Sequence, residues 1–376
     1  MHFESLILIL LATTLLGWGA QKLNLPVVAG QLLAGLILGP ALLNLVHTDS
    51  IITFVADLGV MILMFLAGME TDIKLLRANL LHGFSVAIFG ALVPFLSFWA
   101  IGGFLGMNNE ESIFLGIVFA ATSVSISAEV LTEYNQLKTK AGSTILGAAV
   151  VDDILAVILL SVFVAIFGQG GSSHSDKSVP VLLVLAIAFF AVMYLYTRYI
   201  VPLLFKFVNA VNLNGIIAIV SMFVVLLGSY YAEISGLSEI VGAFFVGLAV
   251  STQKQVHEVI DEFTPVGYAL FIPVFFASIG LNIRLDSVDW IMVILLTILA
   301  FATKYVGSFF GDKILGASAK DANIVGLGMV SRGEMALIFA GIGLGSKLIS
   351  ESNYSMISVV VILTTIIAPI ALKKAF

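Results

Sequence analysis

Apolar segments long enough to cross a lipid bilayer recur along the whole chain of 376 residues. A membrane-spanning helix needs about 20 consecutive, mostly apolar residues. Hydrophobic residues make up 60% of the sequence and charged residues only 11%, whereas soluble domains carry about 25% charged residues. The sequence therefore predicts an all-α, polytopic membrane protein, in which residues 1–376 form a single transmembrane domain with no soluble domain.

Hydropathy predicts about thirteen spans. The first apolar run, 6–20, is preceded by no basic residue and followed by no small-residue cleavage site, so we interpret it as a span and not as a signal peptide. The predicted spans cover residues 4–21, 27–45, 51–69, 83–106, 112–132, 141–168, 180–201, 213–231, 237–252, 264–282, 289–311, 321–346 and 354–373.

The distribution of Lys and Arg predicts the orientation in the membrane, because cytoplasmic loops carry an excess of both. With the N-terminus outside, the inner loops hold twelve of these residues and the outer loops hold three, Lys177, Arg284 and Lys347. We therefore expect a multi-pass protein of the cell membrane, with the N-terminus outside, the C-terminus in the cytoplasm and an odd number of spans.

The chain also contains weak internal matches in a constant order. "LPVVAGQLLAGL" (25–36) matches "LSEIVGAFFVGL" (237–248) at an offset of 212, 65–73 matches 275–283 at 210, and 123–131 matches 331–339 at 208. Partners seven spans apart have opposite orientations in the bilayer. This pattern indicates an inverted-topology repeat, as in secondary transporters that bind their substrate near the membrane midplane. The glycines in the first pair of segments, together with Gly39, are expected to allow close helix packing.

Two adjacent acidic residues, Asp152 and Asp153, lie within the apolar run "AAVVDDILAVILL". Ionisable residues inside a membrane are costly and usually mark an ion or proton pathway. Neighbours on a helix point about 100° apart, so the two carboxylates cannot share one partner symmetrically. We expect at least one of them to face an ion pathway; the alternative is a buried, protonated pair with a structural role.

Lys304 lies within the apolar stretch "ILAFATKYVGSFF". Its expected role is that of counter-ion to one of the two aspartates, from which a bound cation could displace it. The alternative is that its long side chain extends to the membrane interface.

Span 112–132 contains a cluster of hydroxyl side chains in "FAATSVSISAEVL", which includes Thr122 and Ser123. Such residues often join helices by hydrogen bonds. The alternative is an unwound segment whose hydroxyls and freed carbonyls bind a small cation. The repeat favours the second interpretation, because the matching span carries its own polar interruption, "VSRGEMA".

If both helices break and cross, charged side chains must balance the dipoles of the half-helix ends. We therefore assign Arg332, Glu334 and Glu129 structural electrostatic roles. Glu129 and Glu239 are the two candidate partners of Arg332.

Other chemistries find little support. The chain has no cysteine and shows no phosphate-binding glycine loop, no Cys/His metal cluster and no nucleophile triad. We expect no enzyme activity, no catalytic residue, no cofactor and no nucleic-acid partner. The five histidines are expected to be solvated in loops or at termini: His2, His47, His82, His174 and His257.

Several of these motifs resemble one family over essentially the whole chain. They are "LPVVAGQLLAGLILGP", "FLAGMETD", "VVDD", the lysine of the eleventh span and "SRGE". The family is the bacterial monovalent cation:proton antiporter-2 family, in particular its NapA-type sodium/proton antiporters. The resemblance implies a homodimer whose protomers have a dimerisation domain and a core bundle, interleaved in sequence, with two crossed, discontinuous helices (a NhaA/NapA-like fold).

The resemblance also implies a function and assigns site residues. Asp153 matches the ion-binding aspartate, Asp152 matches the aspartate paired with a lysine (here Lys304), and Thr122 and Ser123 match the unwound stretch beside the site. The implied function is exchange of Na+ (or Li+) for H+, expected to be electrogenic with one net charge moved per cycle, by an elevator-like movement. Asp152 and Asp153 would bind the transported Na+. The alternatives are K+/H+ exchange, a membrane sensor without transport, and a channel.

Overall fold

The structure is a computed structural model that describes residues 2–104, 106–167, 179–210, 215–235, 239–282, 289–345 and 348–376. Every regular element in these ranges is a helix. Ten helices are long and apolar enough to cross a membrane, and three shorter apolar helices accompany them. The described part of the chain is therefore an all-helical, polytopic membrane protein, in agreement with the composition.

The first half of the chain begins with two helices joined by a short turn and ends with the long helix that carries Asp152 and Asp153. These helices are α1 (His2–Lys22), α2 (Val27–Leu38), α3 (Ser50–Glu70), α4 (Ile73–Ala78), α5 (Leu80–Phe104), α6 (Asn109–Ala120), α7 (Val124–Glu133) and α8 (Lys140–Phe167).

The second half repeats the alternation of long and short helices and contains two π-helical turns, η1 and η2. It comprises α9 (Val179–Leu195), η1 (Tyr196–Ile200), α10 (Val201–Ala210), α11 (Ile216–Ile234), α12 (Glu239–Val250), α13 (Val256–Val266), η2 (Gly267–Phe271), α14 (Ile272–Leu281), α15 (Trp290–Lys313), α16 (Ala319–Gly328), α17 (Glu334–Gly345) and α18 (Glu351–Lys373).

Polar residues just before the helices set where several of them begin. Asp49 accepts hydrogen bonds from the backbone N–H groups of Ile51 and Ile52 at the start of α3. Asp289 caps α15 in the same way, and Asn108 and Glu111 form a reciprocal capping box at the start of α6. Each cap satisfies N–H groups that a helix leaves without an internal partner.

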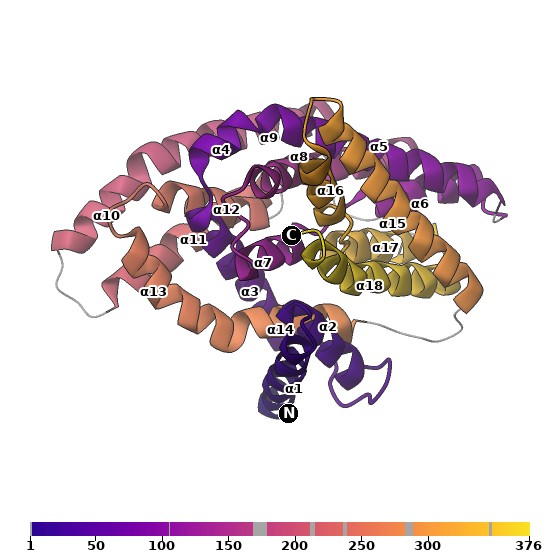
Figure 1. Cartoon of the computed structure of the whole chain (residues 1–376), viewed down its shortest axis with the longest axis horizontal. Coiled ribbons are helices and arrows are strands. Elements are labelled where there is room, and N and C mark those ends of the chain that lie inside the picture. Colours follow the sequence, from indigo (N-terminus) through magenta and orange to yellow (C-terminus); the bar gives the residue numbers. More distant parts are fainter. Residues whose placement is uncertain are drawn as a thin grey trace.

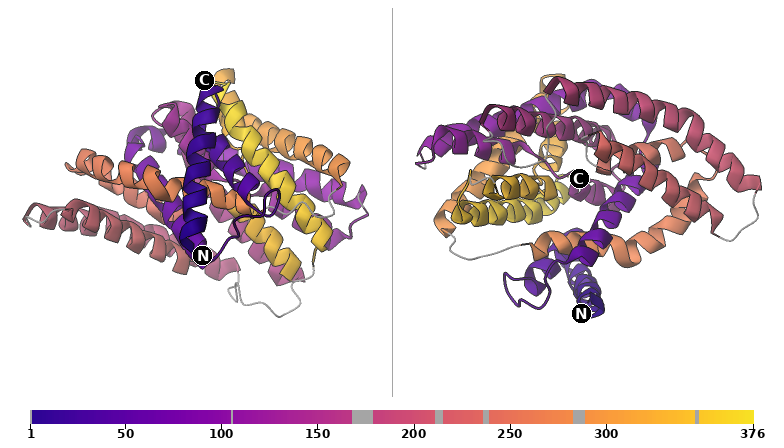
Figure 2. Two further views of the ribbon diagram at one scale, coloured as in Figure 1. Left: turned by 90° about the horizontal axis from the view of Figure 1, so that it is seen from below. Right: turned by 180° about the vertical axis from the view of Figure 1, so that it is seen from behind.

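The helices form two bundles, each built from both halves of the chain (Figure 1). The broken-helix bundle contains α5–α8 and α15–α18, and the frame bundle contains α1–α3 and α11–α14. The N- and C-termini lie at opposite ends of the molecule, as the left view of Figure 2 shows. The C-terminus lies beside the C-terminal end of α1, where Lys373 of α18 donates a hydrogen bond to the carbonyl of Asn24.

Close glycine contacts join the frame bundle in two equivalent places. A Cβ atom on Gly35 of α2 would lie 1.9 Å from the carbonyl oxygen of Ala277 in α14, beside Gly280. A Cβ atom on Gly247 of α12 would lie 2.2 Å from the carbonyl oxygen of Phe65 in α3 and 3.0 Å from Gly68 Cα. One offset of 212 residues relates the first contact to the second. The match of 65–73 with 275–283 therefore has its register at 212 and not at 210.

The close-packing role of the predicted glycines is confirmed. A side chain at any of them would meet backbone atoms within 3 Å, at Gly30, Gly35, Gly39, Gly242 and Gly247.

Several predicted span boundaries were wrong. The second span ends at Leu38 and not at 45, and the tenth helix begins at Val256 and not at 264, because a π-helical turn joins α13 to α14. The twelfth span is not continuous over 321–346. Lys177, Arg284 and Lys347, predicted in the outer loops, lie outside the described residues.

We expect Gly35→Ala and Gly247→Ala each to destabilise the protein by about 1–3 kcal/mol or more, because the added methyl group would overlap a facing backbone. Thermal unfolding of the detergent-purified protein, followed by tryptophan fluorescence, measures the effect. The matched control is Gly19→Ala in α1, where nothing lies within 4 Å of the added atom, and it should stabilise the helix slightly. Equal melting temperatures for the control and the two variants would contradict the close-packing interpretation.

Candidate cation and proton site

Two helices are interrupted at the centre of the broken-helix bundle, and the interruptions touch each other. The first lies at 121–123, between α6 and α7, and the second at 329–333, between α16 and α17. The backbone N–H of Ser123 donates to the carbonyl oxygen of Ser331 at 2.9 Å, and Ser331 Oγ donates to the carbonyl oxygen of Ser123 at 2.7 Å. The expected breaks are therefore present, and the two segments bond at residues that the sequence matched at an offset of 208.

Arg332 satisfies the carbonyl groups that the breaks expose. Its guanidinium donates from Nε (3.1 Å) and one terminal nitrogen (2.8 Å) to the carbonyl oxygen of Phe119, and from the other nitrogen (3.0 Å) to that of Val330. The Arg332 side chain is completely buried. Phe119 lies in the last turn of α6, where the helix dipole is negative. The cation therefore stabilises the end of a half-helix at membrane depth.

Lys304 of α15 donates to the next carbonyl at the end of α6 and also pairs with an acidic side chain. Its Nζ donates to the carbonyl oxygen of Ala120, the last residue of α6, at 2.6 Å and to Asp152 Oδ1 of α8 at 3.1 Å. Lys304 is 0% exposed and Asp152 is 2% exposed. The pairing expected from the sequence is present, and Lys304 does not extend to the membrane interface.

The other expected site residues lie beside this pair. Asp153 follows Asp152 in α8 and is 6% exposed, and Thr122 and Ser123 form the break just after Ala120. Asp152 Oδ2 and Thr122 Oγ1 are buried without a hydrogen-bond partner among the described residues. Carboxylate, hydroxyl and freed carbonyl oxygens are suitable ligands for a small monovalent cation, so the donor set fits a transported Na+.

One electrostatic expectation needs revision, and the one for Glu334 stays a prediction. Glu129 of α7 is not bonded to Arg332: it accepts a hydrogen bond from the Tyr268 hydroxyl of η2 at 2.9 Å. The physical reason is that the backbone carbonyls already use the donors of Arg332. Glu334 begins α17, but its side chain lies outside the part of the chain that the structure describes.

The two bundles are separated at one end and joined at the other. A cavity of about 1200 Å³ opens between α3, α11, α12 and α14 on one side and α17 and α18 on the other. Its lining includes four carboxylates, Asp57, Glu233, Glu239 and Glu351. Away from the cavity, α7 of the broken-helix bundle bonds the frame bundle: Glu129 accepts from the Tyr268 hydroxyl of η2, and Glu133 accepts from the backbone N–H of Val27 of α2 at 3.1 Å.

One polar pair in the broken-helix bundle was missed in the sequence. His82 is not a solvated loop residue: it lies in the first turn of α5, where its Nδ1 is 2.5 Å from Asp312 Oδ1 of α15. Asp312 is 1% exposed. It lies beside Lys313 at the end of an apolar run, so a surface position was the natural interpretation, and no local pattern reveals a partner 230 residues away.

We expect Asp152→Asn and Lys304→Met each to destabilise the fold, by about 3–5 kcal/mol, because each leaves one buried charge without its partner. The double variant should recover much of this loss, since it removes both charges. Thermal unfolding of the four purified proteins completes the double-mutant cycle. Additive losses would mean that the Lys304–Asp152 pair carries no coupling energy.

Comparison with known proteins agrees with this architecture. Residues 7–376 match the family model "Sodium/hydrogen exchanger, transmembrane". A Na+/H+ antiporter of Enterococcus hirae is 44% identical over 370 residues, covering 98% of this chain and 96% of the relative. The Na+/H+-K+ antiporter GerN of Bacillus cereus is 38% identical over 377 residues, covering 100% and 96%.

A solved structure of the sodium proton antiporter MjNhaP1 from Methanocaldococcus jannaschii shares the fold. Its TM-score is 0.66 at 17% identity, over 99% of this chain and 96% of that chain. Together with broken helices that hold a buried lysine–aspartate pair, these matches show that the chain belongs to the transmembrane sodium/hydrogen exchanger family.

Proposed function

We propose that this protein is a secondary antiporter of the NapA type, which exchanges Na+ (or Li+) for H+ across the cell membrane. The observation that carries the proposal is the buried contact of Lys304 with Asp152, beside the break that exposes Thr122 and Ser123. The relatives named as Na+/H+ antiporters support it. Transport, and not enzyme catalysis, is the proposed activity, with no cofactor beyond the transported ions.

In the proposed cycle, Na+ and H+ compete for the same carboxylates. When protons are scarce, Asp153 is ionised and binds a dehydrated Na+ together with Asp152 and the oxygens of Thr122 and Ser123. Lys304 then releases Asp152, and returning protons displace the cation and restore the pair. A free Lys304 ammonium at this depth costs several kcal/mol, which favours loss of its proton when Na+ binds.

The separation of the bundles at one end supports alternating access. The broken-helix bundle would be the core domain, and the frame bundle would be the dimerisation domain of a homodimer. During transport, the core domain would move in an elevator-like manner relative to the dimerisation domain. Ten long and three short apolar helices support thirteen spans, and the paired glycine contacts support an inverted repeat. Termini at opposite ends fit an odd number of spans.

The positive-inside pattern orients this arrangement. Basic residues gather at the closed end, including Lys22, Lys140 and Lys373 at helix ends, whereas carboxylates line the cavity. The cavity would therefore face the outside, with the N-terminus outside and the C-terminus in the cytoplasm. Acidic walls raise the local concentration of cations.

A cycle that moves one net charge would use the membrane potential as well as the pH gradient. Each elementary charge contributes about 2.3 kcal/mol per 100 mV, and each pH unit contributes about 1.4 kcal/mol per proton. Two carboxylates and a lysine provide enough titratable groups for more than one proton per Na+. We therefore propose electrogenic exchange.

K+/H+ exchange is the second candidate. The observation that favours it is the printed name of GerN, a Na+/H+-K+ antiporter that is 38% identical to this chain. Oxygen ligands of the kinds present at Asp152, Asp153 and Thr122 are compatible with either cation.

We expect proteoliposomes that contain the wild-type protein to exchange protons when NaCl or LiCl is added to an imposed pH gradient, as read by a pH-sensitive dye. Asp153→Asn should abolish the flux, because it removes the ionisable ligand. Clamping the membrane potential should change the rate. Flux with KCl alone would support the second candidate, and undiminished flux in Asp153→Asn would contradict the proposed site.

Thr122→Val should raise the KM for Na+ by about 10- to 150-fold, since an apolar isostere removes a polar contact to a charged group, which costs about 1.5–3 kcal/mol. Thr122→Ser keeps the hydroxyl and should transport like the wild type. Because Thr122 Oγ1 has no described protein partner, Thr122→Val should unfold at an unchanged temperature. An unchanged KM would remove Thr122 from the proposed site.

A further inference from the structure

We propose that the His82–Asp312 pair positions Lys304 for its contact with Asp152, and so sets the affinity of the site for Na+. The inference rests on the proposed function. The pair lies at the closed end of the broken-helix bundle, two helical turns from Lys304 along α15, and contacts neither the cation site nor the cavity lining.

The pair is not explained by helix capping. Asp312 lies in the last turn of α15, where an acid is unfavourable, and His82 lies in the first turn of α5, where a protonated imidazole is unfavourable. Lys313, the neighbouring cation, donates to the carbonyl oxygen of Ala317 and is engaged elsewhere. The two side chains therefore stabilise each other against both helix dipoles, in a contact 2.5 Å long with Asp312 almost completely buried.

The contact fixes how α5 and α15 lie along each other. Next to it, Ser85 Oγ donates to the carbonyl oxygen of Gly311 at 2.6 Å. Two turns along, a Cβ atom on Gly90 would lie 2.6 Å from Ser308 Oγ and 3.8 Å from Lys304 Nζ. The same face of α15 thus carries Asp312, Ser308 and Lys304 at four-residue intervals, all facing α5.

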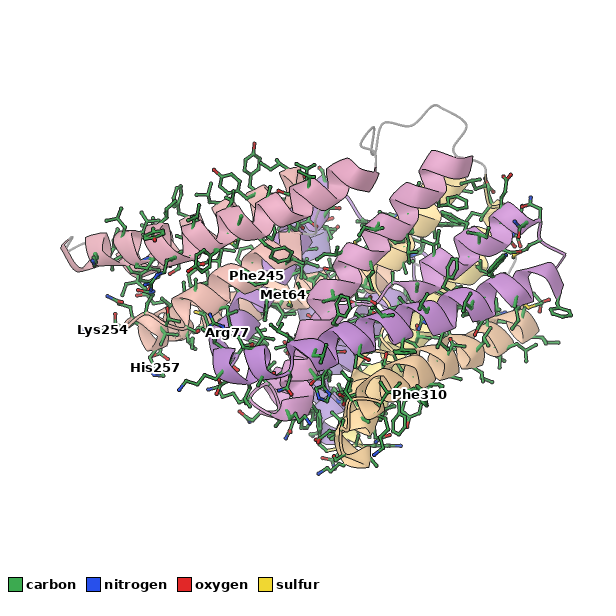
Figure 3. The ribbon with its side chains drawn as sticks, turned by 90° about the horizontal axis from the view of Figure 1, so that it is seen from above. Met64, Arg77, Phe245, Lys254, His257 and Phe310 are labelled. Carbon is green, nitrogen blue, oxygen red and sulfur yellow. The ribbon has the colours of Figure 1, made fainter. Side chains whose placement is uncertain are left out.

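Other faces of α15 contact other helices: the Tyr305 hydroxyl donates to Asn323 Oδ1 of α16 at 2.9 Å. Phe310, two residues from both Ser308 and Asp312, is 55% exposed and projects from the outer surface of the helix (Figure 3). The polar contacts of α15 with α5 lie at its closed end, and those of Lys304 with Ala120 and Asp152 lie further along. A shift of α15 along α5 would therefore move Lys304 away from both partners.

This geometry determines the direction of the expected effect. Lys304 competes with Na+ for Asp152, so an ammonium held less well competes less effectively. Loss of the His82–Asp312 contact should lower the KM for Na+ by about three- to tenfold, which lies within the effects found when a residue outside a site modulates its energetics. A merely structural role would lower the amount of active protein and leave KM unchanged.

The test uses the full-length protein in proteoliposomes and measures KM for Na+ and kcat per folded transporter. The variants are His82→Ala, Asp312→Asn and the exchange His82→Asp with Asp312→His. The control is His257→Ala, which alters an exposed histidine of α13 (Figure 3). The exchanged pair keeps the contact and moves the carboxylate to the first turn of α5, where the helix dipole favours an acid, so it should fold even if a single variant does not.

We expect the single variants to lower KM, and the exchanged pair and the control to keep the wild-type value. If the exchanged pair folds and transports but has the lowered KM of the single variants, or if the single variants keep the wild-type KM, the positioning role is wrong. Absence of cation-driven flux in the wild type would instead contradict the proposed function, and the two failures are therefore distinguishable.

Discussion

Backbone groups exposed at membrane depth are the constraint on which the rest of this structure depends. A helix that stops inside the hydrocarbon region leaves carbonyl and N–H groups that no water can reach, and each costs several kcal/mol if it stays unpaired. Two helices stop there, at Ala120 and Gly328. The protein therefore needs buried donors at these points, and two of them, Lys304 and Arg332, are cations because the C-terminal end of a half-helix is negative.

The donors at the breaks differ in what else they contact. Arg332 directs its hydrogen bonds to backbone carbonyls, so moving it would expose the end of α6. Lys304 divides its ammonium between the carbonyl of Ala120 and the carboxylate of Asp152. In the proposed cycle, a cation that binds Asp152 would compete with only part of this arrangement, because Lys304 Nζ can still donate to the carbonyl of Ala120 after it loses a proton. The proposed exchange would therefore depend on a residue that also bonds the end of the broken helix.

Much of this site could be predicted because polar residues stand out in an apolar sequence. Asp152, Lys304 and the two polar interruptions are each improbable in a bilayer. The residues alone predicted that Lys304 pairs with one of the two aspartates, and the resemblance to the antiporter family selected Asp152. Asp312 could not be identified in this way, since it ends its apolar run beside Lys313 and resembles an interfacial residue. The bond between Glu129 and Tyr268 was also missed, because backbone carbonyls already use the donors of Arg332. Helix ends such as Leu38 depend on tertiary contacts that hydropathy does not report.

The two halves of the chain contribute similar contacts to the frame bundle but different side chains to the interior of the broken-helix bundle. This difference confines the ionisable groups to one place. The contact at Gly35 with α14 has its counterpart at Gly247 with α3, so helices of each half are locked against the other in the same way. Within the broken-helix bundle, however, the helices differ. Helix α8 carries Asp152 and Asp153, whereas α18 has only apolar and hydroxyl residues along its interior. Helix α15 carries Lys304, which faces Gly90 of α5. Gly90 leaves room beside the ammonium that any side chain would fill. A symmetric frame thus surrounds one ionisable pair, and in the proposed cycle two carboxylates and one lysine would bear the whole competition between cation and proton.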